Sequence, residues 1–191
     1  MTPRLLPAAR RVGVAWKNGG GITREVLAGP EGGGGGGFDW RVSLAEVAGD
    51  GPFSVFPGVD RILTLAEGDG MDLTVGGRRW RVGERFVPLA FPGDTPTDCA
   101  LLGGPVVNLN VMCRRGRAAA RVEVVRGRLT DPVRITAPAA GETVLVVALE
   151  GAAALGDLDL GPYDAVLLGP GEEPARLRTE GRAAVVVLRA L

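Results

Sequence analysis

The sequence predicts an all-β protein made of two similar halves. Of its 191 residues, 31 are Gly and 14 are Pro, and these fall between short apolar runs rich in Val and Leu. Frequent turn residues between such runs are typical of many strands joined by tight turns. No window carries a convincing helical period over three turns, so we expect at most a short helical turn within Arg114–Arg121.

Alternation and turn residues predict a strand for each apolar run. The expected strands are Val12–Trp16, Ile22–Ala28, Phe38–Val47, Val59–Glu67, Met71–Val75, Arg78–Val82, Arg85–Pro88, Cys99–Leu102, Val106–Met112, Ala119–Arg126, Val133–Ala137, Thr143–Leu149, Ala152–Leu155, Leu158–Leu160, Ala165–Leu168, Ala175–Arg178 and Ala183–Leu191.

An internal repeat indicates how these strands are grouped. Leu65–Leu73 and Leu149–Leu155 each read as a strand, a Glu-Gly turn and a second strand, and each is followed by a break containing Gly and Pro. A repeated unit of this kind predicts two copies of one β-barrel. We therefore expect two small β-barrels side by side, 1–116 and 117–191, with an exchange of strands between them left open.

A tract of six glycines, Gly32–Gly37, separates two expected strands. A phosphate-binding loop would continue into Lys-Ser or Lys-Thr and a helix, and this tract does not. Because glycine loses the most backbone freedom on folding, a loose hairpin connection between Ala28 and Phe38 is the better interpretation.

Composition excludes several classes of function. The formal net charge is zero and no basic tract stands out, so neither nucleic acid nor an anionic membrane is an expected partner. The segment Met1–Arg10 has no apolar core of a signal peptide, and no apolar run reaches membrane-spanning length. We therefore expect a cytoplasmic protein. Its two cysteines, Cys99 and Cys113, read as small, buried and reduced residues.

The chain contains no histidine. This removes the commonest general base and the commonest transition-metal ligand, so Ser-His-Asp catalysis and His-containing zinc or iron sites cannot be built. We expect no metal, no cofactor and no catalytic residue of these types.

Lys17 stands apart among the basic residues. The chain has 22 basic residues and Lys17 is the one Lys, within the polar, glycine-rich segment Trp16–Glu25. Lys is a compact point charge that Arg cannot replace at a tight site. We therefore favour a functional role for Lys17 over the alternative that this one Lys is present by chance. Asn18 and the glycines after it predict a tight turn, which either presents backbone N–H groups to an anion or simply closes a hairpin.

Two further expected strands and one turn carry candidate ligand-binding residues. Glu46 ends a row in which Phe38, Trp40, Val42 and Leu44 share one face, so it lies either at a rim or in a polar pocket. Arg61 shares a face with Leu63 and Leu65 and is expected to reach inward or to close the barrel mouth with a salt bridge. Asp94, in the turn Phe91–Asp94, is placed at the same mouth or stabilises the turn.

The expected strand Val106–Met112 puts polar side chains on one face. Asn108, Asn110 and Met112 alternate with apolar residues, and the same pitch adds Arg114. Two amides and a guanidinium in one row could hydrogen-bond a carboxylate, whereas the alternative is a solvated outer strand. The second half of the chain is apolar on both faces of its strands, so its barrel is expected to be filled and the ligand site to lie in the first half.

The longest motifs resemble one known family. Trp16–Glu25, Phe38–Val47 and Gly51–Arg61 resemble the HutD/Ves family, and Phe91–Asp94 and Asn110–Gly116 extend the similarity over about 12–116. The resemblance implies a cupin-like bicupin of the RmlC-like jelly-roll type. It also implies a role in histidine utilisation, in which the protein binds a pathway intermediate such as urocanate or a formylated glutamate and restrains the pathway.

Three hypotheses of function follow from the residues and the resemblance, and the third of them is a purely structural interaction module with no cavity in either barrel. The first is a binding protein for a small organic acid, in which Glu46 or Thr23 takes an N–H of the ligand. The expected ligand-binding residues are Lys17, Asn18, Thr23, Arg24, Glu46, Arg61, Asp94, Asn108, Asn110 and Arg114. The second is a metal-independent isomerase or hydrolase with Lys17 as base or Schiff-base nucleophile and Glu46 as acid. An exposed outer sheet leaves a homodimer open.

Overall fold

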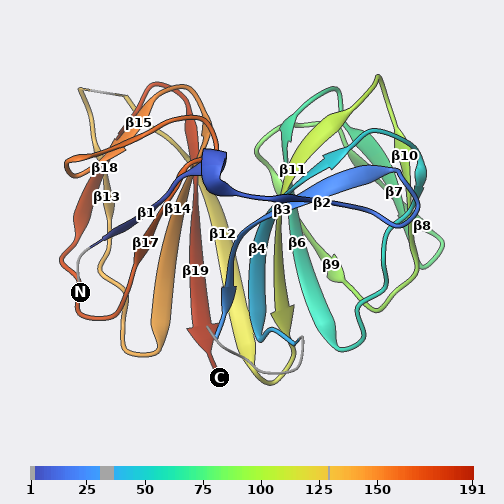
Figure 1. The fold of residues 1–191 in the computed structure, drawn as a ribbon, viewed down its shortest axis with the longest axis horizontal. Coiled ribbons are helices and arrows are strands. Elements are labelled where there is room, and N and C mark those ends of the chain that lie inside the picture. The colour runs from blue at the N-terminus through green and yellow to red at the C-terminus, as the bar shows by residue number, and fades with distance from the viewer. Residues whose placement is uncertain (1–2, 31–36, 129) are drawn as a thin grey trace. The chain divides into compact units, whose positions relative to one another are not determined.

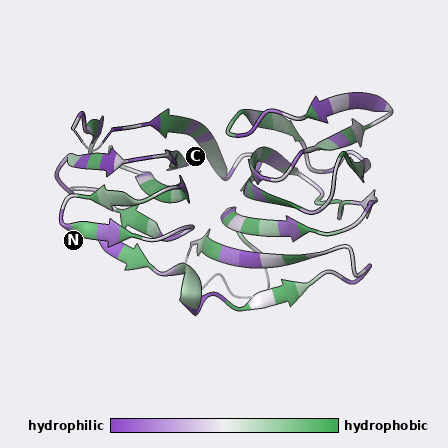
Figure 2. Cartoon of the chain, turned by 90° about the horizontal axis from the view of Figure 1, so that it is seen from above, coloured by the Kyte–Doolittle hydropathy of each residue, from purple (hydrophilic) through white to green (hydrophobic). Residues whose placement is uncertain are grey.

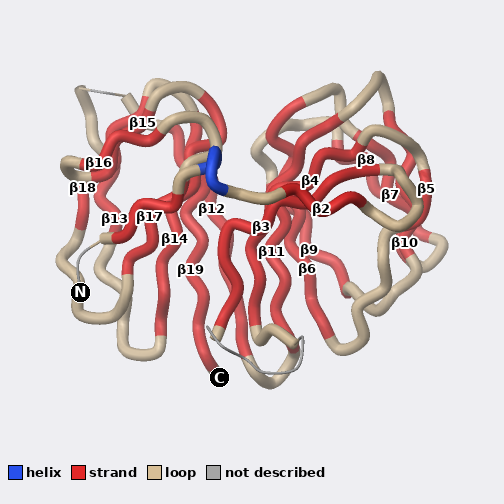
Figure 3. Tube along the Cα trace, viewed as in Figure 1, coloured by secondary structure: helices blue, strands red, loops and turns tan. Residues whose placement is uncertain are grey.

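A computed structural model describes residues 3–30, 37–128 and 130–191 of the protein. The chain forms two compact units, one of Val12–Arg117 and one that combines Met1–Arg11 with Ala118–Leu191. Strands supply nearly all of the regular structure in the described ranges, and the helix drawn in Figure 3 is the single 3-10 turn η1 (Ala8–Arg10). The all-β class predicted from the turn-rich sequence is confirmed.

The unit of Val12–Arg117, called here the N-terminal unit, contains two antiparallel sheets (Figure 1). The six-stranded sheet has the order β2 (Gly13–Ala15), β3 (Gly21–Gly29), β4 (Trp40–Val47), β11 (Val106–Arg114), β6 (Val59–Glu67) and β9 (Pro88–Pro92). The four-stranded sheet has the order β5 (Gly51–Pro52), β10 (Thr97–Leu101), β7 (Met71–Val75) and β8 (Arg78–Val82).

The other unit, called the C-terminal unit, repeats this plan. Its five-stranded sheet has the order β1 (Arg4–Leu6), β17 (Ala165–Leu168), β14 (Glu142–Glu150), β19 (Arg182–Ala190) and β12 (Ala118–Arg126). Its four-stranded sheet has the order β13 (Val133–Ile135), β18 (Ala175–Thr179), β15 (Ala153–Leu155) and β16 (Leu158–Leu160). The repeat seen in the sequence corresponds to β6–β7 in one unit and β14–β15 in the other, each with a positive-φ glycine (Gly68, Gly151) in the turn.

In each unit, side chains of both sheets pack together in a hydrophobic core. In the N-terminal unit, Leu63 and Leu65 of β6 pack with Met71 and Leu73 of β7, and in the C-terminal unit residues of β14 pack with residues of β15 and β18. Figure 2 shows green, apolar segments beside purple, hydrophilic ones within the strands of both units. The sheets are open rather than closed barrels, because strands such as β2 and β9 end the hydrogen-bonded order and side-chain packing closes each unit.

The first strand differs from the expected division at residue 116. β1 pairs with β17, with Leu5 opposite Val166, and Leu5 packs on the core of the C-terminal unit. The Arg11 guanidinium also donates to the backbone oxygen of Tyr163 at 2.7 Å. The N-terminal residues therefore belong with the C-terminal unit, because a three-residue strand is stable only where a sheet edge and a core accept it.

Other local expectations differ from the structure in simple ways. The segment considered for a helical turn is instead a tight turn that connects two different sheets, since β11 ends at Arg114, β12 begins at Ala118 and Gly116 has a φ of 71°. The strand expected from Arg85 begins instead at Pro88 as β9. The connection predicted at Gly32–Gly37 lies, apart from Gly37, outside the described residues.

Cys99 and Cys113 are free thiols, and both are buried. Burial raises the pKa of each thiol to about 11. In the portion of the chain that the structure covers, no helix is both long and apolar enough to cross a lipid bilayer.

We expect the substitution Asp72→Asn to remove part of the acid sensitivity of this fold. Hydrogen bonds from Arg81 and Arg79 lower the pKa of the nearly buried Asp72 carboxyl to about 2, below the value of about 3.9 for an unfolded chain. The stability that this carboxylate contributes is therefore complete above pH 4 or so and is lost as the pH falls towards about 2. Urea unfolding midpoints measured from about pH 6 to pH 3 should fall less steeply for the variant than for the wild type.

Asp98→Asn is the matched control, because Asp98 is exposed on the neighbouring strand β10. It should leave the wild-type slope in place, and an identical slope for Asp72→Asn would show that this ion cluster does not contribute.

Candidate functional site

The inner face of the six-stranded sheet carries three rows of side chains that run across its strands. One row contains Thr23, Ala45, Asn108 and Leu65, and a second contains Glu25, Ser43, Asn110 and Leu63. A third contains Arg41, Met112, Arg61 and Phe91. Because directly opposed residues in antiparallel strands lie about 5 Å apart, each row forms one continuous strip of the face.

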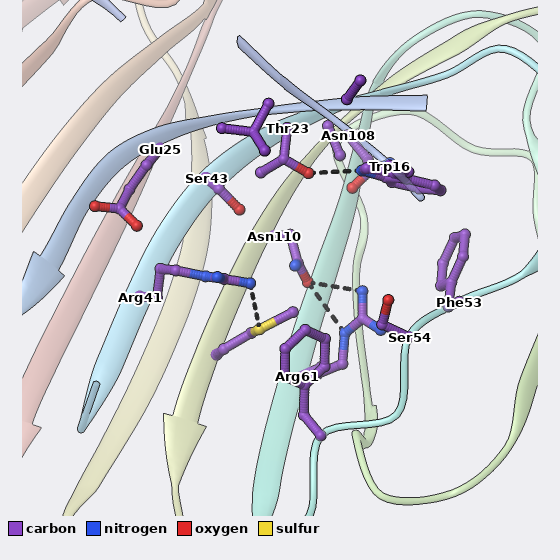
Figure 4. A pocket seen from close by; sticks show the side chains of 15 residues that line it. Trp16, Thr23, Glu25, Arg41, Ser43, Phe53, Ser54, Arg61, Asn108 and Asn110 are labelled. Carbon is purple, nitrogen blue, oxygen red and sulfur yellow. Dashed lines mark hydrogen bonds between the residues drawn. The ribbon is translucent and has the colours of Figure 1, made fainter. Parts of the chain in front are cut away.

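These rows form the floor of a cavity of about 280 Å³ in the N-terminal unit. Trp16 and the segment between β5 and β6 supply further walls. The lining residues are Val14, Ala15, Trp16, Thr23, Glu25, Arg41, Ser43, Ala45, Phe53, Ser54, Phe56, Arg61, Asn108, Asn110 and Met112. Figure 4 shows most of the polar members pointing into a common space.

The cavity exists because the middle of the floor is made of small residues. Ser43 and Ala45 on β4 lie beside Asn110 and Asn108 on β11. On the other side of β11, β6 carries Leu63 and Leu65, whose larger side chains pack in the hydrophobic core. Replacing leucine-sized side chains by Ser and Ala leaves a gap that close packing would otherwise remove.

Arg61 is the most unusual group in the cavity. It is 7% exposed, and its Nε and Nη2 atoms both lie 3.4 Å from Oδ1 of Asn110. Its guanidinium carbon lies 5.0 Å from the ring centre of Phe91 and 5.2 Å from that of Phe53. In the part of the chain that the structure describes, Arg61 makes no salt bridge, so an almost fully buried cation is compensated only by an amide oxygen and ring faces.

A second guanidinium lies nearby. Arg41 stacks on Phe38 at 4.9 Å and on Phe56 at 5.4 Å, and Phe56 also lies 5.9 Å from Arg61. Burial, followed by the charge of Arg41, lowers the pKa of Arg61 to about 10. The pKa of Arg41 is also lowered by burial, against the charge of Glu25. Both guanidiniums stay protonated at neutral pH, and together they create a positive potential on the cavity floor.

Unsatisfied donors add to this potential. The Nδ2 atom of Asn108, a residue only 2% exposed, has no hydrogen-bond partner among the described atoms, and neither has Nε of Arg41. A buried donor without a partner costs free energy. The floor is therefore chemically suited to a bound group that accepts hydrogen bonds and carries negative charge.

Of the ten residues proposed from the sequence, four line this cavity: Thr23, Arg61, Asn108 and Asn110. Thr23 is held by the indole of Trp16, whose Nε1 donates to Oγ1 at 2.8 Å. The two asparagines lie on the same face of β11, as the alternation predicted, and that face lines the cavity.

Lys17 does not line the cavity, although it was the leading candidate. It lies exposed in the turn between β2 and β3, outside the cavity lining. The turn itself accounts for its neighbours: Oδ1 of Asn18 accepts from the amide of Gly20 at 3.1 Å, and Gly19 has a φ of 72°. A Cβ at Gly21 would lie 3.1 Å from the Trp16 ring, so the glycines serve the hairpin rather than an anion.

Glu46 and Arg24 also face away from the cavity and pair with each other. The apolar row of β4 was expected to face the hollow interior, but the opposite row, with Arg41, Ser43 and Ala45, lines it. Both faces of β4 are buried, so hydrophobicity alone could not distinguish them. The proposed catalytic pair of Lys17 and Glu46 is thus not assembled in this cavity.

Asp94 and Arg114 lie near the cavity without lining it. Asp94 accepts from Arg115 at 2.6 Å, and Arg115 also donates to Asp60 at 2.7 Å. The hydrogen bond from Arg115 holds the pKa of Asp94 below its usual value. Arg114 instead donates through Nε to the backbone oxygen of Phe38 at 3.2 Å.

Several lining residues were not singled out from the sequence. Arg41, Ser43 and Glu25 could have been found as the polar side of strands whose other side is apolar. Phe53 and Phe56 were seen only as aromatics at a strand entrance, because nothing local indicates that their segment folds over Arg61.

A shallower hollow of about 240 Å³ lies in the C-terminal unit, where Arg121, Glu142 and Arg189 are among its lining residues. Arg121 is 72% exposed there, so its charge is solvated. Among the described residues, no group of three or more Cys, Asp or Glu side chains is placed to hold a metal ion.

Comparison with known proteins gives a consistent result. A family model described as HutD matches residues 8–187. The 21.2 kDa protein of the hutC 3′ region of Pseudomonas putida is 34% identical over 187 residues, covering 97% of this chain and 96% of that protein. Protein Ves of Citrobacter koseri is 38% identical over 143 residues, 74% of this chain and 70% of its own length.

Among solved structures, HutD from Pseudomonas fluorescens SBW25, determined in a formate condition, is similar over 100% of both chains, with a TM-score of 0.87 and 31% identity. The similarity to the HutD/Ves family and the cupin-like fold that it implied are both confirmed.

We expect Arg115→Met to loosen the segment that carries Phe53 and Phe56 over the cavity. Arg115 joins Asp60 and Asp94, and next to it the amide of Phe56 donates to the oxygen of Gly93 at 2.8 Å. Loss of the double ion pair should speed hydrogen exchange at the Phe56 and Gly93 amides.

Arg117→Met is the control, since Arg117 is exposed in the same turn. Unchanged exchange at Phe56 in the Arg115 variant would show that the segment holds its place without the ion pairs.

Proposed function

The chain belongs to the HutD family, and on this premise we propose that its N-terminal unit binds a small organic carboxylate and thereby modulates histidine utilisation. The ligand is an intermediate of histidine degradation, of the urocanate or formylglutamate class. The single observation that carries this proposal is Arg61, a nearly buried guanidinium that faces a cavity and has no carboxylate partner among the described residues.

A bound carboxylate would compensate the burial of the Arg61 guanidinium. Removing a guanidinium from water costs several kcal/mol, roughly, unless an opposite charge or strong hydrogen bonds replace the lost hydration. Here the ring faces of Phe53 and Phe91 and one amide oxygen replace only part of it. A carboxylate accepts hydrogen bonds in the fork geometry that guanidinium offers, so it would complete this environment.

The size of the cavity limits the ligand. A volume of about 280 Å³ lies at the lower end of small-molecule sites, which suits a metabolite of about ten non-hydrogen atoms. Trp16, Phe53 and Phe56 give the walls flat apolar surfaces against which a planar or short aliphatic stem can pack.

The connection to histidine degradation rests on relatives. One relative is named for its place in the hutC 3′ region, and a similar structure is called HutD. The enzyme hypothesis needed Lys17 and Glu46 in one cavity, and Glu46 instead pairs with Arg24 on the other face. No specific feature of the cavity favours that second hypothesis.

The test is calorimetry of the wild type and Arg61→Met with urocanate and N-formyl-L-glutamate. Loss of a charged hydrogen bond should weaken binding by about 1.5–3 kcal/mol, which is roughly 10- to 150-fold in the dissociation constant. Because Met removes an uncompensated buried charge, the unliganded variant should unfold at a temperature no lower than the wild type.

Lys17→Met is the matched control and should bind as the wild type does, since Lys17 lies outside the cavity lining. Equal affinities of wild type and Arg61→Met would contradict the site, and failure of the wild type to bind either acid would contradict the function.

A further inference from the structure

We propose that Glu25 is the specificity-determining residue of this cavity: its carboxylate accepts a hydrogen bond from an N–H group at the end of the ligand remote from Arg61. The inference rests on the proposed function and narrows it to acids that also carry an N–H donor.

Glu25 lies two strands away from Asn110 in the six-stranded sheet. Glu25 on β3 lies opposite Ser43 on β4, which in turn lies opposite Asn110 on β11. Strands are spaced about 4.8 Å apart, so the backbones at Glu25 and Asn110 are separated by about 10 Å. Asn110 binds Arg61, and Figure 4 shows Glu25 and Arg61 on opposite sides of Asn110.

Glu25 lies on the cavity face because it follows Thr23 by two residues on β3, and a β-bulge comes directly after it. The register between β3 and β4 shifts between Glu25 and Leu27, so Val26 is the extra residue. Such bulges reorient side chains locally. Thr23 and Glu25 therefore share the cavity face before the shift, whereas Leu27 after it pairs with Val42 of the opposite face.

The cavity lining carries charges of both signs. Its ionisable members are Arg41, Arg61 and Glu25. Glu25 interacts electrostatically with Arg41, but its carboxylate makes no salt bridge or side-chain hydrogen bond within the described ranges. The cavity therefore has donors around Arg61 and Asn108 and a charged acceptor, Glu25, at its solvent-exposed end, two strands from Asn108 and three from Arg61.

Thr23, Ser43 and Glu46 are weaker candidates than Glu25 for accepting this hydrogen bond. Oγ1 of Thr23 already accepts from Trp16, and Glu46 lies on the other face of the sheet, paired with Arg24. Ser43 offers only a neutral hydroxyl. An N–H donor that reaches across Ser43 from a carboxylate held at Arg61 therefore meets Glu25, and a charge-assisted hydrogen bond is about twice as strong as a neutral one.

The experiment uses two pairs of acids that differ in the N–H group. Urocanate is compared with 3-(2-furyl)acrylate, and N-formyl-L-glutamate with N-formyl-N-methyl-L-glutamate, by calorimetry on the full chain. For at least one pair the wild type should bind the N–H acid about tenfold more tightly than its analogue. Glu25→Leu should reduce this ratio to near one while leaving the affinity for the analogue within about threefold.

Glu25→Gln tests charge separately from geometry, because its amide oxygen still accepts a hydrogen bond, and an intermediate ratio is expected. Glu46→Gln is the control and should keep the wild-type ratio. A ratio near one in the wild type, or an unchanged ratio in Glu25→Leu, overturns the role of Glu25 while carboxylate binding stands. If the wild type binds none of the four acids, both proposals fall.

Discussion

The enclosure of the Arg61 guanidinium is the constraint on which the rest of the site depends. Phe53, Phe56 and Phe91 surround the cation at 5.0 to 5.9 Å, and Asn110 supplies its oxygen partner. Holding a charge in such surroundings requires that the covering segment stay in place, which the ion pairs of Arg115 with Asp60 and Asp94 support. It also requires space beside the charge, which the small residues of β4 provide. The aromatic walls, the ion pairs of Arg115 and the small residues of β4 thus all serve the enclosure of one buried ion.

The two units show how one architecture serves different ends. In the C-terminal unit, Val146, Ala148 and Val166 of the large sheet pack directly against Leu155 and Leu177 of the small sheet, with almost no exposure. In the N-terminal unit, the corresponding space holds amides, hydroxyls and guanidiniums around a cavity. A filled sandwich contributes stability through apolar burial, whereas a hollow polar one gives up part of that burial for recognition. This difference accounts for the cluster of Arg41, Arg61 and Asn108 around the cavity of the N-terminal unit.

Much of the fold could be predicted from the sequence, and less of the site. Turn residues and alternation predicted nearly every long strand and the repeat, and they put Asn108 and Asn110 on one face of β11, which lines the cavity. On β4, the same patterns favoured the face of Glu46 over the face of Arg41, which lines the cavity. Both faces of that strand are buried, so hydrophobicity did not distinguish them. Lys17 was favoured because it is the one Lys in the sequence. The rarity of a residue type carries no information about the direction in which its side chain points. An exchange of strands between the two halves was left open, but that β1 is the exchanged strand was not predicted, since its partner β17 lies far along the chain.

The sequence by itself determined which side chains share a face, because the side-chain period of a strand is a local property of its backbone. It therefore determined the rows that Thr23 and Glu25, Ser43 and Ala45, and Asn108 and Asn110 contribute. The tertiary structure decided which face of the sheet became the cavity and which of 22 basic residues became the enclosed cation. That choice depends on contacts between residues distant in the chain, such as Phe91 and Phe53 with Arg61, and enclosure in a low-dielectric interior is a property that no local pattern encodes.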